Sequence, residues 1–129
     1  MKLTKKDIAS LVCIHEDRAV SIYLWQDSPY GIPVVVKTLR QGSFSAHEVQ
    51  RLANEYAILQ DLHIPGIRRV YERLILDGQP ALVMEYIPGE TLKKAFVEER
   101  RPLVENLAAA ISIARSLAEL RRVGIVHRN

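Results

Sequence analysis

The change of hydrophobic period along the chain constrains its fold most. Between residues 8 and 40, β-branched and aromatic side chains dominate three segments, 8–14, 19–25 and 32–39. Asp, Ser, Pro and Gly residues at 27–31 supply turn chemistry between the second and third segments. The pattern predicts three strands joined as a meander.

A helical period follows. Apolar residues recur at steps of three and four, which places them on one face of a helix. Gly42 with Ser43 or Ser45 supplies the candidate N-terminal cap, and Pro65 with Gly66 ends the segment. The apolar face comprises Val49, Leu52, Tyr56, Leu59 and Leu62.

Two more strands and two helices complete the predicted order. Segments 67–76 and 80–87 flank the dipeptide Asp77-Gly78, which favours a tight hairpin turn. A loop and short helix are expected over 88–96, and a longer helix from Leu103 to Val123. The sequence therefore predicts an α+β fold.

Composition and charge exclude several classes of protein. With 48% apolar and 26% charged residues among 129, the chain is predicted to fold as a globular protein. The net charge of +3 is spread among acidic residues, which does not favour nucleic-acid binding. The single Cys13 excludes a disulfide framework, and Cys or His pairs at metal-ligand spacing are lacking, so no metal site is predicted. No apolar run approaches the roughly 20 residues of a membrane span. A cytoplasmic location fits best.

Lys37 and Glu55 are the candidate functional charges, and each has two interpretations. Lys37 ends the apolar segment VVVK, where its ammonium either extends to water or holds an anion in a cleft. Glu55 lies between Leu52 and Leu59, where its carboxylate is either solvated or paired with a cation. The residues alone leave both choices open.

Four motifs in order resemble the eukaryotic-type serine/threonine protein kinases, a family also found in bacteria. VVVK resembles the family's Val-Ala-Ile-Lys strand, and Glu55 falls where its regulatory helix carries a glutamate. ALVMEYIPGETL is similar to the hinge between kinase lobes, and GIVHRN to the start of the His-Arg-Asp loop. Intervals of 18, 30 and 44 residues separate Lys37, Glu55, Glu85 and Asn129. The ordered set is more specific than any one motif.

This resemblance implies a kinase amino-terminal lobe over residues 1–86, with a five-stranded antiparallel sheet and one regulatory helix. Residues 87–129 would form the hinge and the first helices of an incomplete second lobe, cut at the His-Arg-Asp motif. The implied activity is phosphoryl transfer from ATP to protein hydroxyl groups in signal transduction. The implied partners are ATP and either a protein substrate or downstream domains of a longer protein.

The resemblance also assigns roles to individual residues. Lys37 would contact the α and β phosphates, oriented by Glu55. Ile22 and Val35 would cover the adenine face, with Met84 behind the pocket. The backbone carbonyl of Glu85 and the backbone amide of Ile87 would hydrogen-bond adenine.

Several departures from the family pattern bear on activity. The segment IHEDRAVSIY stands where kinases carry a glycine-rich phosphate loop, contains no glycine, and places Glu16 and Asp17 near a triphosphate. Val35 replaces the usual alanine and narrows the adenine slot. Asn129 stands at the position of the catalytic aspartate, and an amide cannot serve as that base. The catalytic-loop asparagine and Asp-Phe-Gly motif, which hold magnesium, are also absent, so we predict no phosphoryl transfer by this chain alone.

Several interpretations therefore stay open. The chain is an ATP-binding fragment of a protein kinase, a noncatalytic pseudokinase scaffold, or part of a small-molecule phosphotransferase of kinase-like fold. LQDLHIPGIRRVYE is similar to kinase domains that open large bacterial proteins carrying ATPase, sensor and histidine kinase modules. The helix over 103–123 is apolar on more than one flank and is expected to promote self-association.

Overall fold

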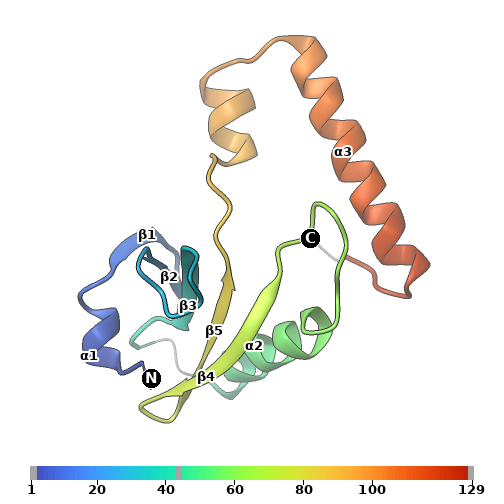
Figure 1. The fold of residues 1–129 in the computed structure, drawn as a ribbon. Helices are drawn as coiled ribbons and strands as arrows, with labels where there is room; N and C mark the ends of the chain where they lie inside the picture. The colour runs from blue at the N-terminus through green and yellow to red at the C-terminus, as the bar shows by residue number, and fades with distance from the viewer. Residues whose placement is uncertain (1–2, 43–44, 128–129) are drawn as a thin grey trace. The chain divides into compact units, whose positions relative to one another are not determined.

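The computed structural model describes residues 3–42 and 45–127 (Figure 1). These residues form two compact units, one comprising 1–62 and 68–86 and the other 63–67 and 87–129. The elements are α1 (Lys5–Ile8), β1 (Val12–Glu16), β2 (Val20–Trp25), β3 (Val34–Leu39), α2 (Ala46–Leu59), β4 (Val70–Leu76), β5 (Gln79–Glu85), η1 (Lys93–Glu98) and α3 (Leu103–Arg122).

An antiparallel sheet organises the first unit. In the described part of the chain, five strands pair in the order β1-β2-β3-β5-β4. The predicted meander and the predicted hairpin at Asp77-Gly78 are both confirmed. In the centre of the sheet, Lys37 of β3 lies opposite Ile22 of β2 and Leu82 of β5. The α+β prediction is confirmed as well.

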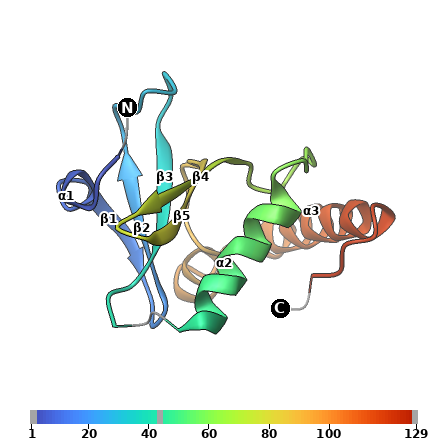
Figure 2. The same cartoon turned by 90° about the horizontal axis from the view of Figure 1, so that it is seen from below.

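The alternation of side chains along β3 gives the sheet two apolar faces. Val34 and Val36 point to the face covered by α1, whereas Val35 points to the face covered by α2. Figure 2 shows these two helices on opposite sides of the sheet. The α1-side core contains Leu3, Ile8, Trp25, Val34, Val36, Leu76, Ala81 and Val83; the α2-side core contains Val35, Leu39, Leu52, Val70, Leu82 and Met84.

Helix α2 forms where its period predicts it. Ser45 is the N-terminal cap, because its hydroxyl accepts a hydrogen bond from the Glu48 amide at 3.2 Å. Leu52 is buried, and Tyr56 and Leu59 pack partly buried against the α2-side core. The helix ends at Leu59, before the predicted Leu62.

The start of the chain differs from the prediction. Residues 5–8 form the short helix α1, so the first strand begins at Val12 and not near Ile8. Thr4 and Asp7 cap this helix reciprocally: the Thr4 amide donates to Asp7 Oδ2 at 2.8 Å, and the Asp7 amide donates to Thr4 Oγ1 at 3.3 Å. Ile8 is thereby turned into the α1-side core.

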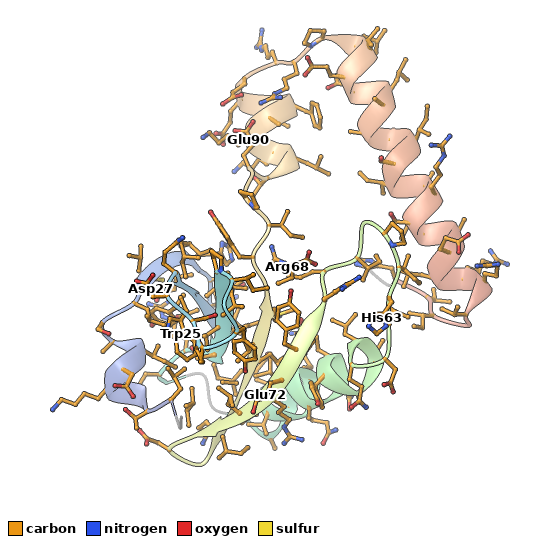
Figure 3. The ribbon with its side chains drawn as sticks, viewed as in Figure 1. Trp25, Asp27, His63, Arg68, Glu72 and Glu90 are labelled. Carbon is orange, nitrogen blue, oxygen red and sulfur yellow. The ribbon has the colours of Figure 1, made fainter. Side chains whose placement is uncertain are left out.

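The second unit contains the short π-helix η1 and the α-helix α3. Arg101, in the loop between them, contacts Glu90, Glu99 at 3.4 Å and Glu105 at 3.6 Å. Glu90 lies in the segment that leads into η1 (Figure 3). The negative charge of Glu90 raises the pKa of the Arg101 guanidinium, with smaller contributions from the other two carboxylates. These contacts join the segment before η1 to the start of α3.

Helix α3 is exposed along most of its surface in the part of the chain that the structure describes. Its exposed apolar side chains are Leu103, Val104, Leu107, Ile111, Ile113 and Leu117, whereas Leu120 is buried. Near its C-terminal end, Ser116 Oγ donates to the Pro65 carbonyl at 3.2 Å. No helix among residues 3–42 and 45–127 is both long and apolar enough to cross a bilayer.

Candidate functional site

Lys37 and Glu55 form a two-point ion pair between β3 and α2. Lys37 Nζ lies 2.7 Å from Glu55 Oε2 and 3.0 Å from Oε1. The two side chains are 20% and 28% exposed, so the pair is partly shielded from water. Strand alternation turns Lys37 to the α2 side of the sheet, and the helical period turns Glu55 to the same side as Leu52 and Leu59. The pairing implied by the kinase resemblance is present, whereas the catalytic role of both residues stays a prediction.

Apolar residues predicted to cover a base lie on the same face of the sheet as Lys37. Val35, two residues before Lys37 on β3, is 1% exposed. Met84 is opposite Val35 in the pairing of β3 with β5 and is also buried. Ile22, opposite Lys37 on β2, packs partly buried against the same core. The structure thus gathers these three residues and the ammonium on one face, and their contact with a base stays a prediction.

The hinge residues lie at the boundary between the two units. Glu85 ends β5; its amide donates to the Arg69 carbonyl at 2.9 Å, and its Oε2 accepts from the Arg69 amide at 3.1 Å. Ile87 belongs to the second unit and is 48% exposed. Asn129, at the position of the usual catalytic base, lies outside the described residues. The roles assigned to these three residues therefore stay predictions.

The turn between β1 and β2 stands where the sequence predicts the phosphate loop. Asp17 Oδ1 accepts hydrogen bonds from the amides of Ala19 at 2.8 Å and Val20 at 2.9 Å. The Asp17 amide donates to the Val20 carbonyl at 3.0 Å, which closes the turn. Sequence reasoning noted only the charge of Asp17, although aspartate commonly accepts from amides two or three residues ahead.

Glu16 contacts other groups than the amides of Ala19 and Val20. Its Oε2 accepts from the Ser21 hydroxyl at 3.0 Å, and its Oε1 lies 3.3 Å from Arg40 Nη2. All three residues line a pocket of about 460 Å³ together with Ile8 of the α1-side core. The carboxylate of Glu16 is therefore directed to the α1 side of the sheet, opposite to Lys37.

The polar contact between Tyr30 and Glu72 was not predicted from the sequence. The Tyr30 hydroxyl donates to Glu72 Oε2, and the rings of Tyr30 and Tyr71 stack with their centroids 6.0 Å apart. Glu72 is on the edge strand β4 (Figure 3). Because 42 residues separate Tyr30 from Glu72, no local pattern could have indicated the contact.

Within 3–42 and 45–127, no three His, Cys, Asp or Glu side chains come together as a metal-binding group. Lys37 with Glu55 therefore remains the functional candidate that the geometry supports best.

Comparison with known proteins agrees with the motifs. The family model of protein tyrosine and serine/threonine kinases matches residues 18–129. A probable serine/threonine-protein kinase of Bacillus subtilis, YbdM, is 31% identical over 88 residues, which are 67% of this chain and 34% of that protein. The serine/threonine-protein kinase PkaB of Streptomyces coelicolor is 35% identical over 75% of this chain and 24% of its own length. A probable serine/threonine-protein kinase of the same organism is 35% identical over 84% of this chain and 17% of its own length. The chain thus spans about a third or less of these relatives.

Proposed function

The chain belongs to the protein tyrosine and serine/threonine kinase family, and from this premise we propose that it forms the ATP-binding portion of a serine/threonine protein kinase. The ion pair between Lys37 and Glu55 carries the proposal, because it fixes a partly exposed ammonium beside an apolar face. In kinases, a lysine held this way by a glutamate of the regulatory helix binds nucleotide phosphates.

The residues present fit an anionic nucleotide with a planar base. Lys37 would bind the α and β phosphates as a point charge, and Glu55 would hold the lysine side chain in one orientation. Ile22 and Val35 would pack on the base, and Met84 would close the pocket behind it. ATP, when bound, supplies the phosphoryl group. The magnesium that accompanies ATP in this family is held there by a catalytic-loop asparagine and the aspartate of an Asp-Phe-Gly motif, which these 129 residues do not contain.

Nucleotide titration tests the proposal. We expect ATP, ADP and adenosine each to raise the melting temperature, measured by thermal shift with and without magnesium. Lys37→Ala and Glu55→Gln should weaken ATP binding several-fold and leave adenosine binding nearly unchanged. Lys6→Ala removes an exposed lysine from α1 and serves as the charge-matched control. Absence of any shift with all three ligands would contradict the proposal and favour a noncatalytic scaffold.

We further propose that this chain alone transfers no phosphoryl group. Asn129 carries an amide where the family has its general base, and an amide does not accept the substrate proton. A phosphotransfer assay that shows turnover with the purified chain, lost in Lys37→Ala, would overturn this statement. Turnover on a small hydroxylated or aminated compound, with none on protein, would favour the small-molecule phosphotransferase.

The partners and location belong to the same proposal. The chain would act on, or connect to, a protein substrate or further domains of a longer signalling protein in the cytoplasm. The exposed apolar residues of α3 would also allow one copy of the chain to bind another.

A further inference from the structure

The turn between β1 and β2 already contains an anion of its own. Asp17 Oδ1 receives the amide protons of both Ala19 and Val20, at 2.8 and 2.9 Å. Asp17 Oδ2 lies 3.6 Å from His15 Nε2. Hydrogen bonds from the Val20 and Ala19 amides lower the pKa of the Asp17 carboxyl, so the group is ionised near neutral pH. Oδ1 of this carboxylate is therefore occupied by amides of the turn itself, and Oδ2 lies near His15 of β1.

Arg40 holds the turn in this conformation from the end of β3. Its backbone amide donates to the Ala19 carbonyl at 2.8 Å, and its guanidinium Nη1 donates to the Asp17 carbonyl at 3.2 Å. Nη2 of the same guanidinium lies 3.3 Å from Glu16 Oε1. The turn is thus tied to β3 at three points, which favours the closed arrangement of Asp17 over its alternatives.

The occupied amides lie at the start of β2, two pairing positions from Lys37. Lys37 is opposite Ile22; Val20, two residues before Ile22, is opposite Leu39, two residues after Lys37. A nucleotide whose phosphates reach Lys37 would therefore extend toward the amides of Ala19 and Val20. Backbone amides in such turns are the groups that bind phosphate in glycine-rich loops.

We propose that Asp17 determines the ligand specificity of this site by occupying, with its own carboxylate, the backbone amides that would otherwise receive a phosphate group. The inference rests on the proposed nucleotide-binding function. A bound nucleotide is then held through its base and Lys37, and the turn adds nothing to phosphate recognition. The missing glycines are part of the explanation, but the amides of Ala19 and Val20 are present and become available once Asp17 is removed.

Occupancy of the amides and simple charge repulsion make different predictions for three variants. Asp17→Ala removes the carboxylate and frees both amides. Asp17→Asn removes the charge but keeps an oxygen that can accept from the same amides. Glu16→Gln removes an equal charge one residue away, from a side chain that bonds Ser21 and Arg40 on the α1 side. Only the first variant frees the amides of Ala19 and Val20.

Affinities for adenosine, ADP and ATP, measured by isothermal titration calorimetry, distinguish these cases. We expect Asp17→Ala to tighten ATP and ADP binding about tenfold and to leave adenosine binding unchanged, because charge-assisted hydrogen bonds form only with phosphates. Asp17→Asn and Glu16→Gln should change ATP affinity less than about threefold by the same reasoning. Equal gains in all three variants, or no gain in Asp17→Ala, would overturn the inference.

A second measurement keeps the inference testable without any nucleotide. Sodium tripolyphosphate is titrated while the amide signals of Ala19 and Val20 are followed by NMR. We expect both signals to move saturably in Asp17→Ala and to stay in place in the wild-type chain and in Asp17→Asn. Equal responses in wild type and Asp17→Ala would overturn the inference. If adenosine binds to none of the proteins, the proposed function fails, and the tripolyphosphate titration still decides the role of Asp17.

Discussion

Lys37 of β3 contacts both carboxylate oxygens of Glu55 of α2, at 2.7 and 3.0 Å, and so joins the sheet to the helix that covers it. The pair is neither fully exposed nor fully buried. Its coupling energy should therefore lie between that of surface pairs and that of buried pairs, at about 1–2 kcal/mol. A double-mutant cycle with Lys37→Met and Glu55→Gln, followed by urea unfolding, measures this energy.

A matched control for this cycle lies on the same helix. Arg51 Nη1 is 3.3 Å from Glu48 Oε1; the cation of this pair is 61% exposed, against 20% for Lys37, and Glu48 is 21% exposed. The cycle with Arg51→Met and Glu48→Gln should give about 0.3–0.5 kcal/mol, as exposed helix pairs do. Equal coupling energies for the two pairs would contradict the view that partial burial strengthens the contact of Lys37 with Glu55.

Patterns among neighbouring residues predicted most of the helices and strands of the first unit. The β-branched run of Val34, Val35 and Val36 predicted a strand, and in the structure each face of that strand has its own core. Asp77 and Gly78 both have positive φ, 50° and 78°, as the tight turn of a hairpin requires. These features were predictable because each depends on residues close together in the sequence.

The missed features have different causes. Helix α1 is four residues long, too short for a helical period to appear, although Thr4 and Asp7 carry the spacing of a capping pair. The sequence showed the charge of Asp17 but not the direction of its carboxylate, which depends on how Arg40 holds the turn. The contact of Tyr30 with Glu72 depends on the sheet order, which brings distant segments together.

The contact between Tyr30 and Glu72 predicts a pH dependence of stability. Burial, followed by the hydrogen bond to Glu72 and its negative charge, raises the pKa of Tyr30 from 10.0 to about 12. The folded protein then holds this proton more tightly than the unfolded chain. The stabilisation is intact below pH 10 and is lost as the pH rises toward 12. Urea unfolding across this range should show the decrease, and Tyr30→Phe should reduce it.

Glu72→Gln separates the causes of this pKa shift. Removing the charge should lower the pKa of Tyr30 only part of the way to its ordinary value, because burial is the larger cause. Ultraviolet absorbance of the ionised phenol, taken as the difference from Tyr30→Phe, follows this single group. A Tyr30 pKa that does not change in Glu72→Gln would contradict the contact.

Gly66 is predicted to be the least replaceable glycine of the second unit. Its φ of 87° disfavours any other residue, and a Cβ at this position would overlap Ser116 Oγ. Gly66→Ala should lower the free energy of unfolding by about 2–4 kcal/mol, from backbone strain and the lost contact of Ser116 with the Pro65 carbonyl. Thermal unfolding monitored by circular dichroism measures this loss.

Gly124 provides the control for this substitution. Its φ is 83°, close to that of Gly66, but a Cβ there would meet no atom within 4 Å. Gly124→Ala should therefore lower the free energy of unfolding by only about 1 kcal/mol. Equal losses for the two alanine variants would show that the approach of Ser116 to Gly66 has no energetic effect.

The exposed apolar side chains of α3 predict self-association. Leu107 and Ile111, one turn apart, are 54% and 52% exposed and lie among further exposed apolar side chains of the helix. Apolar area of this kind gains free energy when another surface removes it from water. Sedimentation velocity should show concentration-dependent association of the chain. Leu107→Glu with Ile111→Glu should reduce it, whereas Arg115→Glu, which changes the net charge by the same amount one turn beyond Ile111 but removes no apolar side chain, should reduce it less. A monodisperse monomer at high concentration in wild type would contradict the prediction.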